Sequence, residues 1–112
     1  MASVDSVEMG ERLKKQRLLQ GYSRERLAEL ADITPRFCYD LELGLKNMSV
    51  NTLCKLSSSL HVPADYILFG PVSENEKLQP IKGVLETCPL NKLEHLEQII
   101  SHYIQAVTAE SD

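Results

Sequence analysis

The sequence predicts an all-α protein, with five short helices in residues 8–70 and a helical tail in residues 71–112. Three observations favour this fold class. Apolar residues recur at steps of three and four, which is the period of a helix. N-capping residues and glycines divide these runs into short segments. A chain of 112 residues also has room for one small domain with an appendage.

The first two helices are expected over residues 8–20 and 24–31. Gly21 follows the first, and glycine readily adopts the left-handed conformation in which many helices end. Ser23 then precedes the second helix as an N-cap, because its hydroxyl can accept a hydrogen bond from a free backbone N–H. Apolar residues at helical spacing around Leu27 give this helix one face to bury.

The third helix is expected over residues 35–42, after the start signal Thr34-Pro35. Threonine caps a helix, and proline is tolerated at the first helical position because the N–H it lacks would have no partner there. Cys38 and Leu41 would point inward. The second and third helices have only about eight residues each, too few to be stable alone. They must therefore pack as a unit around a short turn, which is a helix-turn-helix.

The starts and ends of the remaining helices are also indicated by capping residues, prolines and glycines. Ser49 caps a fourth helix over residues 50–60, and Val62-Pro63 opens a fifth that closes at Gly70. In the tail, a polar linker leads to Gln79-Pro80 and a short helix, and Cys88-Pro89 opens the last one.

The last helix has the clearest pattern in the chain. Its apolar stripe steps by three, four, three and four residues and must pack on something. We expect it to hold a homodimer, with packing on its own domain as the open alternative. The interface residues that we expect are Leu93, Leu96, Ile100, Tyr103, Ile104 and Val107.

Composition and charge exclude several classes of protein. The net charge is −4, but residues 1–69 balance nine basic against nine acidic side chains, so the acidity belongs to the tail. No apolar run is long enough to span a membrane, and the acidic N-terminus is not a signal peptide. The three cysteines favour neither disulfides nor a metal site, which indicates a reducing cytoplasm. No catalytic pattern, cofactor motif or small-molecule site is evident, so we do not expect an enzyme.

From Leu13 to Gly70 the sequence resembles a known family, the phage-repressor-type helix-turn-helix regulators called XRE or Cro-like. The elements that carry the resemblance, in order, are Arg17, Gly21-Tyr22-Ser23, Leu27-Ala28, Ala31, Ile33-Thr34, Leu41-Glu42, Gly44, Ser49, Thr52-Leu53, Leu56, Leu60 and Asp65-Tyr66-Ile67-Leu68-Phe69-Gly70. The resemblance implies a lambda-repressor-like DNA-binding domain over residues 8–70. It leaves residues 71–112 as a linker and a dimerisation tail.

The resemblance also implies which residues meet DNA. Those at the phosphates would be Ser23 and Arg24 at the second helix, and Lys46 and Asn47 after the third. Thr34, Pro35, Arg36, Phe37, Tyr39 and Asp40 would lie on the recognition helix that enters the major groove. Arg36 suits guanine, because its guanidinium can donate two hydrogen bonds to the O6 and N7 atoms.

Three residues on or beside this surface have particular interpretations. Asp40 either accepts a hydrogen bond from cytosine or forms an ion pair with Arg36 four residues earlier. Phe37 either touches a thymine methyl group or is a partly buried core residue. The resemblance further implies that Arg17 and Glu42 form an ion pair between the first helix and the recognition helix.

Together these expectations describe a bacterial, cytoplasmic, sequence-specific transcription regulator that is nucleoid-associated when bound. We expect a homodimeric repressor on a two-half-site operator, with DNA and a second copy of the chain as its partners. Two alternatives stay open: a protein-interaction module that has lost DNA binding, and an antitoxin-like subunit of a larger complex.

Overall fold

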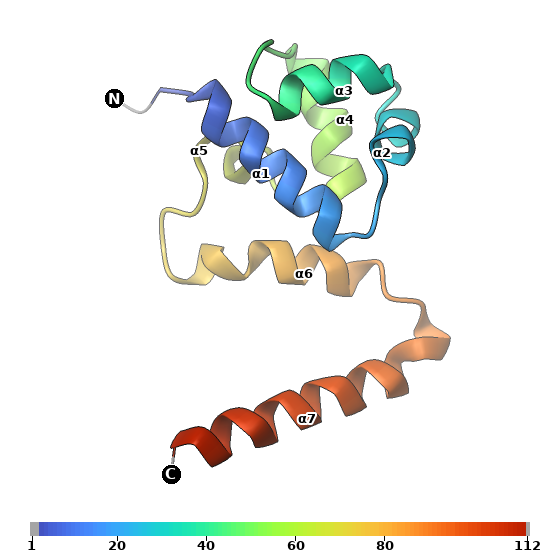
Figure 1. The fold of residues 1–112 in the computed structure, drawn as a ribbon, viewed down its shortest axis with the longest axis vertical. Helices are drawn as coiled ribbons and strands as arrows, with labels where there is room; N and C mark the ends of the chain where they lie inside the picture. The colour runs from blue at the N-terminus through green and yellow to red at the C-terminus, as the bar shows by residue number, and fades with distance from the viewer. Residues whose placement is uncertain (1–2, 112) are drawn as a thin grey trace.

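The computed structural model describes residues 3–111 and shows an all-helical protein, which confirms the predicted fold class (Figure 1). The elements are α1 (Ser6–Leu19), α2 (Arg24–Leu30), α3 (Pro35–Glu42), α4 (Val50–Leu60), α5 (Ala64–Phe69), the 3₁₀ turn η1 (Asn75–Leu78), α6 (Gln79–Glu86), the 3₁₀ turn η2 (Leu90–Lys92) and α7 (Leu93–Ser111). None of the described residues forms a strand, and no helix among them is long and apolar enough to cross a membrane.

Local capping explains where the short helices begin. The Ser23 hydroxyl accepts from the Arg26 N–H at 3.0 Å, Thr34 accepts from the Phe37 N–H at 3.0 Å, and Ser49 accepts from the Thr52 N–H at 3.1 Å. Each of these bonds satisfies one of the backbone donors that a helix N-terminus leaves free. The first helix starts earlier than expected because Asp5 caps it, accepting from the Val7 and Glu8 N–H groups at 3.0 Å.

The core lies where α1 to α5 converge (Figure 1). Its fully buried apolar residues are Met9, Leu13, Leu27, Ala28, Ala31, Cys38, Leu41, Leu56, Leu60, Val62 and Ile67. Phe37 packs against this cluster while only partly buried, so it contributes at least in part to the core. α1 crosses close to α3 at Gly10, where any Cβ would collide with the backbone carbonyls of Leu41 and Glu42. This close approach sets the recognition helix against α1.

α6 packs against this core domain, although it lies beyond the boundary predicted at Gly70. The Gln16 side-chain amide donates to the Pro80 carbonyl at 3.1 Å, and the Thr87 hydroxyl donates to the Gln20 side chain at 3.1 Å. Gly83 is buried against the His61 carbonyl oxygen. α6 therefore faces the domain through Pro80 and Gly83, and its apolar Ile81 and Leu85 stay exposed.

Gly83→Ala tests whether α6 docks in solution as it does here. The new Cβ would collide with the His61 carbonyl, so we expect the free energy of unfolding to fall by about 1–3 kcal/mol. Denaturant unfolding measures the change, and Lys82→Ala, at the exposed neighbouring position, is the control. If α6 were detached, the same substitution would instead stabilise the helix by about 1 kcal/mol, so a gain in stability would contradict the docking.

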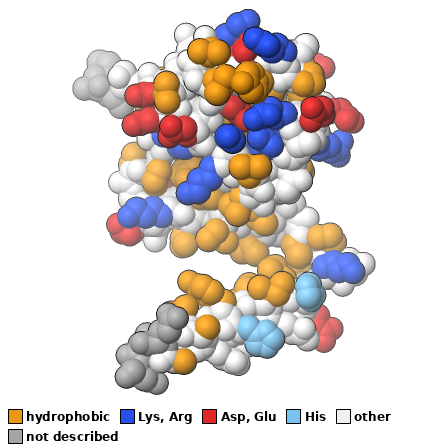
Figure 2. Space-filling model, in the orientation of Figure 1, with side chains coloured by type: hydrophobic (Ala, Val, Ile, Leu, Met, Phe, Trp, Pro, Cys, Tyr) orange, Lys and Arg blue, Asp and Glu red, His pale blue; other side chains and the backbone are white. Residues whose placement is uncertain are grey.

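α7 lies apart from the rest of the protein and runs below α6 in the view of Figure 1. Its main packing is with η2, the turn that leads into it. Six of its large apolar side chains are exposed, namely Leu93, Ile99, Ile100, Tyr103, Ile104 and Val107, and Leu96 is partly buried. Figure 2 shows apolar side chains along the face of α7 that is turned toward α6. The helix therefore presents an apolar surface that the described part of the chain does not cover.

Candidate nucleic-acid interface

The helix-turn-helix is built from α2 and α3, joined by residues 31–34. The Ile33 N–H donates to the Ala28 carbonyl at 2.9 Å, which closes the turn. Asp32 occupies the left-handed conformation with φ of 55°, and aspartate tolerates this conformation better than most residues. Its carboxylate lies 3.3 Å from the Lys55 ammonium of α4. The turn is thus held both by its backbone and by a neighbouring helix.

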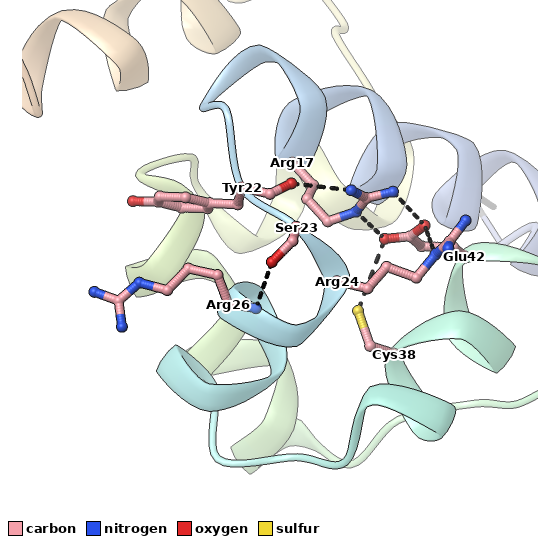
Figure 3. Close-up of polar contacts among 7 residues, drawn as sticks. All are labelled: Arg17, Tyr22, Ser23, Arg24, Arg26, Cys38 and Glu42. Carbon is pink, nitrogen blue, oxygen red and sulfur yellow. Dashed lines mark hydrogen bonds and ion pairs between the residues drawn. The ribbon is translucent and has the colours of Figure 1, made fainter.

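Arg17 and Glu42 lie together at the junction of α1 and α3 (Figure 3). Arg17 donates from Nε to Glu42 Oε2 at 2.6 Å and from Nη2 to Oε1 at 3.1 Å, a bidentate pair. Its Nη1 also donates to the Tyr22 carbonyl at 2.9 Å. The two side chains are only 6% and 2% exposed. The hydrogen bond to Glu42 raises the pKa of the Arg17 guanidinium, against the opposing effect of burial.

Glu42 has two further partners that local sequence patterns did not predict. Arg24 Nε lies 3.2 Å from Glu42 Oε1, and the Cys38 thiol donates to Oε2 at 3.7 Å (Figure 3). Burial, then the Glu42 charge and hydrogen bond, raise the pKa of Cys38 to about 11. The thiol therefore stays protonated and donates. One carboxylate thus contacts two arginines, so these three side chains together carry one net positive charge.

The exposed Tyr39 ring of α3 has two guanidinium groups close to it. The Arg24 guanidinium carbon is 5.0 Å from the ring centroid, and that of Arg36 is 5.8 Å away. Cations within about 6 Å of an aromatic face are attracted by its negative quadrupole. The ring therefore holds together one arginine from each helix of the motif. A hollow of about 260 Å³ adjoins it, with Lys14 at its edge.

Asp40 differs from its expected placement. It was expected to face outward, but only 5% of the residue is exposed. Arg36 Nε lies 3.3 Å from its Oδ1, and Lys46 Nζ lies 3.7 Å from its Oδ2. Asp40 is thus buried, whereas both of its ion-pair partners are exposed. Of its two interpretations, the ion pair with Arg36 is therefore present, and Lys46 adds a second one.

The other expected DNA-binding residues are exposed around α3. Pro35 and Arg36 lie in its first turn, and the Arg36 side chain is 81% exposed. Lys46 and Asn47 lie in the loop that follows the helix. The Asn47 Oδ1 atom accepts from the Ser6 hydroxyl at 3.1 Å, which ties this loop to the start of α1. The hydroxyls of Ser23 and Thr34 are occupied as helix caps.

Sequence reasoning missed the second partners of Glu42, Tyr39 and Asp40. Arg24 and Glu42 are 18 positions apart, which is no helical spacing. Lys14 is exposed, as expected. Residues 12–55 carry nine basic against five acidic side chains, and this local surplus of positive charge was the available signal. Within the described residues, no group of three or more His, Cys, Asp or Glu side chains is arranged to hold a metal ion.

The chain is similar to helix-turn-helix proteins that are named as transcriptional regulators. A helix-turn-helix family model matches residues 13–67. The chain is 43% identical over 61 residues to an uncharacterised SPbeta prophage-derived HTH-type transcriptional regulator, YonR of Bacillus subtilis; these residues are 54% of this chain and 56% of that protein. The chain thus spans about half the length of the curated relatives it matches.

Two solved structures share the fold. The restriction-modification controller protein C.AhdI of Aeromonas hydrophila is 30% identical with a TM-score of 0.55, over 57% of this chain and 97% of that one. A chain from the complex of the SinR and SinI proteins is 25% identical with a TM-score of 0.54, over 87% of this chain and 98% of that one. The second match extends beyond the first five helices into the tail.

Proposed function

Since this chain belongs to the XRE-type helix-turn-helix family of transcriptional regulators, we propose that it is a repressor that binds a two-half-site operator as a homodimer. Its partners are then double-stranded DNA and a second copy of itself, and it acts in the cytoplasm. Bound at a promoter, such a dimer would exclude the polymerase.

The observation that carries the proposal is the exposed guanidinium of Arg36 in the first turn of α3. A short helix fits the major groove, which is about 12 Å wide, and presents its N-terminal side chains to the base edges. Arg24 at the start of α2 and Lys46 in the loop after α3 supply two further cations, with side chains 37% and 60% exposed, that suit the phosphate backbones bordering the groove. The surface thus combines one candidate base contact with two candidate phosphate contacts.

The homodimer follows from the uncovered apolar surface of α7. A single recognition helix covers one half-site, and regulators with this motif gain affinity by placing two such helices about 34–36 Å apart. Ile100, Tyr103 and Ile104 lie exposed on one face of α7, and Ile81 and Leu85 of α6 are exposed as well. A second copy of α7 covers this surface, while Glu94 and Glu97 keep the tail away from DNA phosphates.

Arg36→Ala and Lys46→Ala are expected to have different effects on DNA binding. The first should lower the affinity for the operator by about 1–3 kcal/mol and relax the preference at one base pair. The second should weaken binding to all sequences alike and flatten the dependence of log K on log salt by about one unit, because one phosphate contact is lost.

Selection of bound sequences from random DNA, followed by titration at several salt concentrations, measures both effects. Each variant controls for the other, since both remove one positive charge from the same surface. Identical selectivity profiles for the wild-type protein and the Arg36 variant would contradict the assignment of Arg36 to base readout.

A second candidate is a protein-interaction module or antitoxin-like subunit on the same fold. The exposed apolar face of α7 and the net charge of −4 favour it. Salt-dependent DNA titration separates the two functions: a chain that binds no duplex at low salt has lost the DNA function, whereas a steep salt dependence supports it.

A further inference from the structure

Asp40 is a buried carboxylate beneath the surface that is proposed to face DNA. Its side chain is 7% exposed, while those of the two cations beside it, Arg36 and Lys46, are 81% and 60% exposed. Arg36 belongs to the first turn of α3, and Lys46 belongs to the loop after it. One carboxylate therefore contacts two exposed cations that come from different parts of the motif.

The carboxylate is incompletely satisfied where it lies. Among the described side chains, Asp40 Oδ1 is the one buried polar atom without a hydrogen bond, although Arg36 Nε lies 3.3 Å away. Buried polar groups are normally hydrogen-bonded, and an exception in a native structure calls for an explanation. A contribution to fold stability does not explain this exception, because ion pairs with exposed partners contribute little to stability. The position of Asp40 under the proposed DNA surface explains it.

The cations are held in place by more than Asp40. The Arg36 guanidinium also lies 5.8 Å from the Tyr39 ring, and the Arg24 guanidinium lies 5.0 Å from the same ring. Arg36 thus has two contacts, one from its Nε to Asp40 and one from its guanidinium to the ring. The Nε contact leaves the two terminal nitrogens of Arg36 available for a guanine edge. Lys46 lies 3.7 Å from the other carboxylate oxygen, so one buried side chain contacts both cations.

We propose that Asp40 is a specificity-determining positioning residue: it orients Arg36 and Lys46 from below and limits binding to DNA of arbitrary sequence. This inference rests on the proposed function. Affinity for arbitrary DNA comes from positive charge at the phosphates, whereas specificity comes from side chains fixed against base edges. A buried carboxylate under the cations lowers the affinity for arbitrary DNA and increases the specificity for the operator.

Asp40→Asn keeps the shape of the side chain and removes its charge. We expect the affinity for a random-sequence duplex at low salt to rise about three- to tenfold, since a negative charge a few ångströms from the bound phosphates is gone. The preference at the base pair read by Arg36 should weaken, so that the ratio of operator to random-sequence affinity falls. In an Arg36→Ala background, Asp40→Asn should leave that base preference unchanged, because the residue that it positions is absent.

The control is Asp65→Asn in α5, which removes an exposed carboxylate of the same domain. It makes the same change in net charge and should leave both affinities within about twofold of the wild-type values. Asp40→Glu is the second variant; it retains the negative charge, so its affinity for random-sequence DNA should stay at the wild-type level. Thermal unfolding of each variant shows that the fold is kept.

Two outcomes would overturn the inference while leaving DNA binding intact. If Asp40→Asn lowers operator affinity and alters the preference at a cytosine without raising random-sequence affinity, then Asp40 contacts a base directly. If both affinities and the sequence preference are unchanged, then Asp40 neither positions nor restrains the cations. A wild-type chain that binds no duplex at all would instead overturn the proposed function, and this inference with it.

Discussion

Glu42→Ala is expected to lower the free energy of unfolding by about 3–5 kcal/mol, because it leaves the buried Arg17 guanidinium without its partner. Arg17→Ala should cost less. In that variant, Arg24 and the Cys38 thiol still contact the Glu42 carboxylate, so the remaining charge keeps part of its compensation. Urea unfolding monitored by circular dichroism measures both changes. This asymmetry is specific to a carboxylate shared by two arginines.

The double variant isolates the interaction between the two residues. Arg17→Ala with Glu42→Ala should cost clearly less than the sum of the two single changes, since no unpaired charge is then left buried. The exposed pair Arg26 and Glu29, whose side chains are 52% and 74% exposed, is the matched control. Its variants should be additive and cost less than about 1 kcal/mol. Strict additivity for Arg17 and Glu42 would show that they do not interact.

Ile100→Glu should convert the protein to a monomer and lower its affinity for a two-half-site operator about 100-fold or more. The new charge would lie on the apolar face of α7, and losing the partner would lose the gain from engaging two half-sites together. Binding to a single half-site should be unchanged, because α7, which contains Ile100, lies far from α3 along the chain and apart from it in Figure 1. Sedimentation and DNA titration measure the two properties.

Gln98→Glu is the control for this variant, since position 98 lies on the opposite face of the helix by its 100° periodicity. A point substitution is preferable to a chain ending at Gly70. That truncation would also remove α6, which covers Gln16 and contacts the His61 carbonyl. A dimeric Ile100→Glu protein with unchanged operator affinity would place the interface elsewhere. A monomeric wild type that Ile100→Glu destabilises would instead favour packing of α7 on its own domain.

The boundaries of the short helices were predictable because they depend on local contacts. Ser23, Thr34 and Ser49 each accept from an N–H three residues further along, so the bond needs only its own segment. The starts of α2, α3 and α4 were therefore placed correctly within a residue or so. Asp5 was overlooked as a cap, and so α1 begins at Ser6 rather than near residue 8.

The features of the site likewise fall into those that were predictable from local sequence and those that were not. The recognition helix and its exposed Arg36 were identified from caps, period and family resemblance, all of which lie within a short stretch of chain. Three other features of the site were not identified from the sequence. They are the sharing of the Glu42 carboxylate, the contacts of the Tyr39 ring with two arginines, and the burial of Asp40. Arg24 and Glu42 are 18 positions apart, and no spacing rule connects residues across two helices whose crossing is unknown.

The helices, the helix-turn-helix and the family were predictable from the sequence, because caps, turns and apolar periods act within one or two turns of chain. The three-dimensional packing was needed to show which charges meet, which face of α6 is buried, and that α7 is left uncovered. Those outcomes depend on how closely the helices approach, as where Gly10 and Gly83 let backbones touch. Such distances follow from the packing of the whole core, which no single segment encodes.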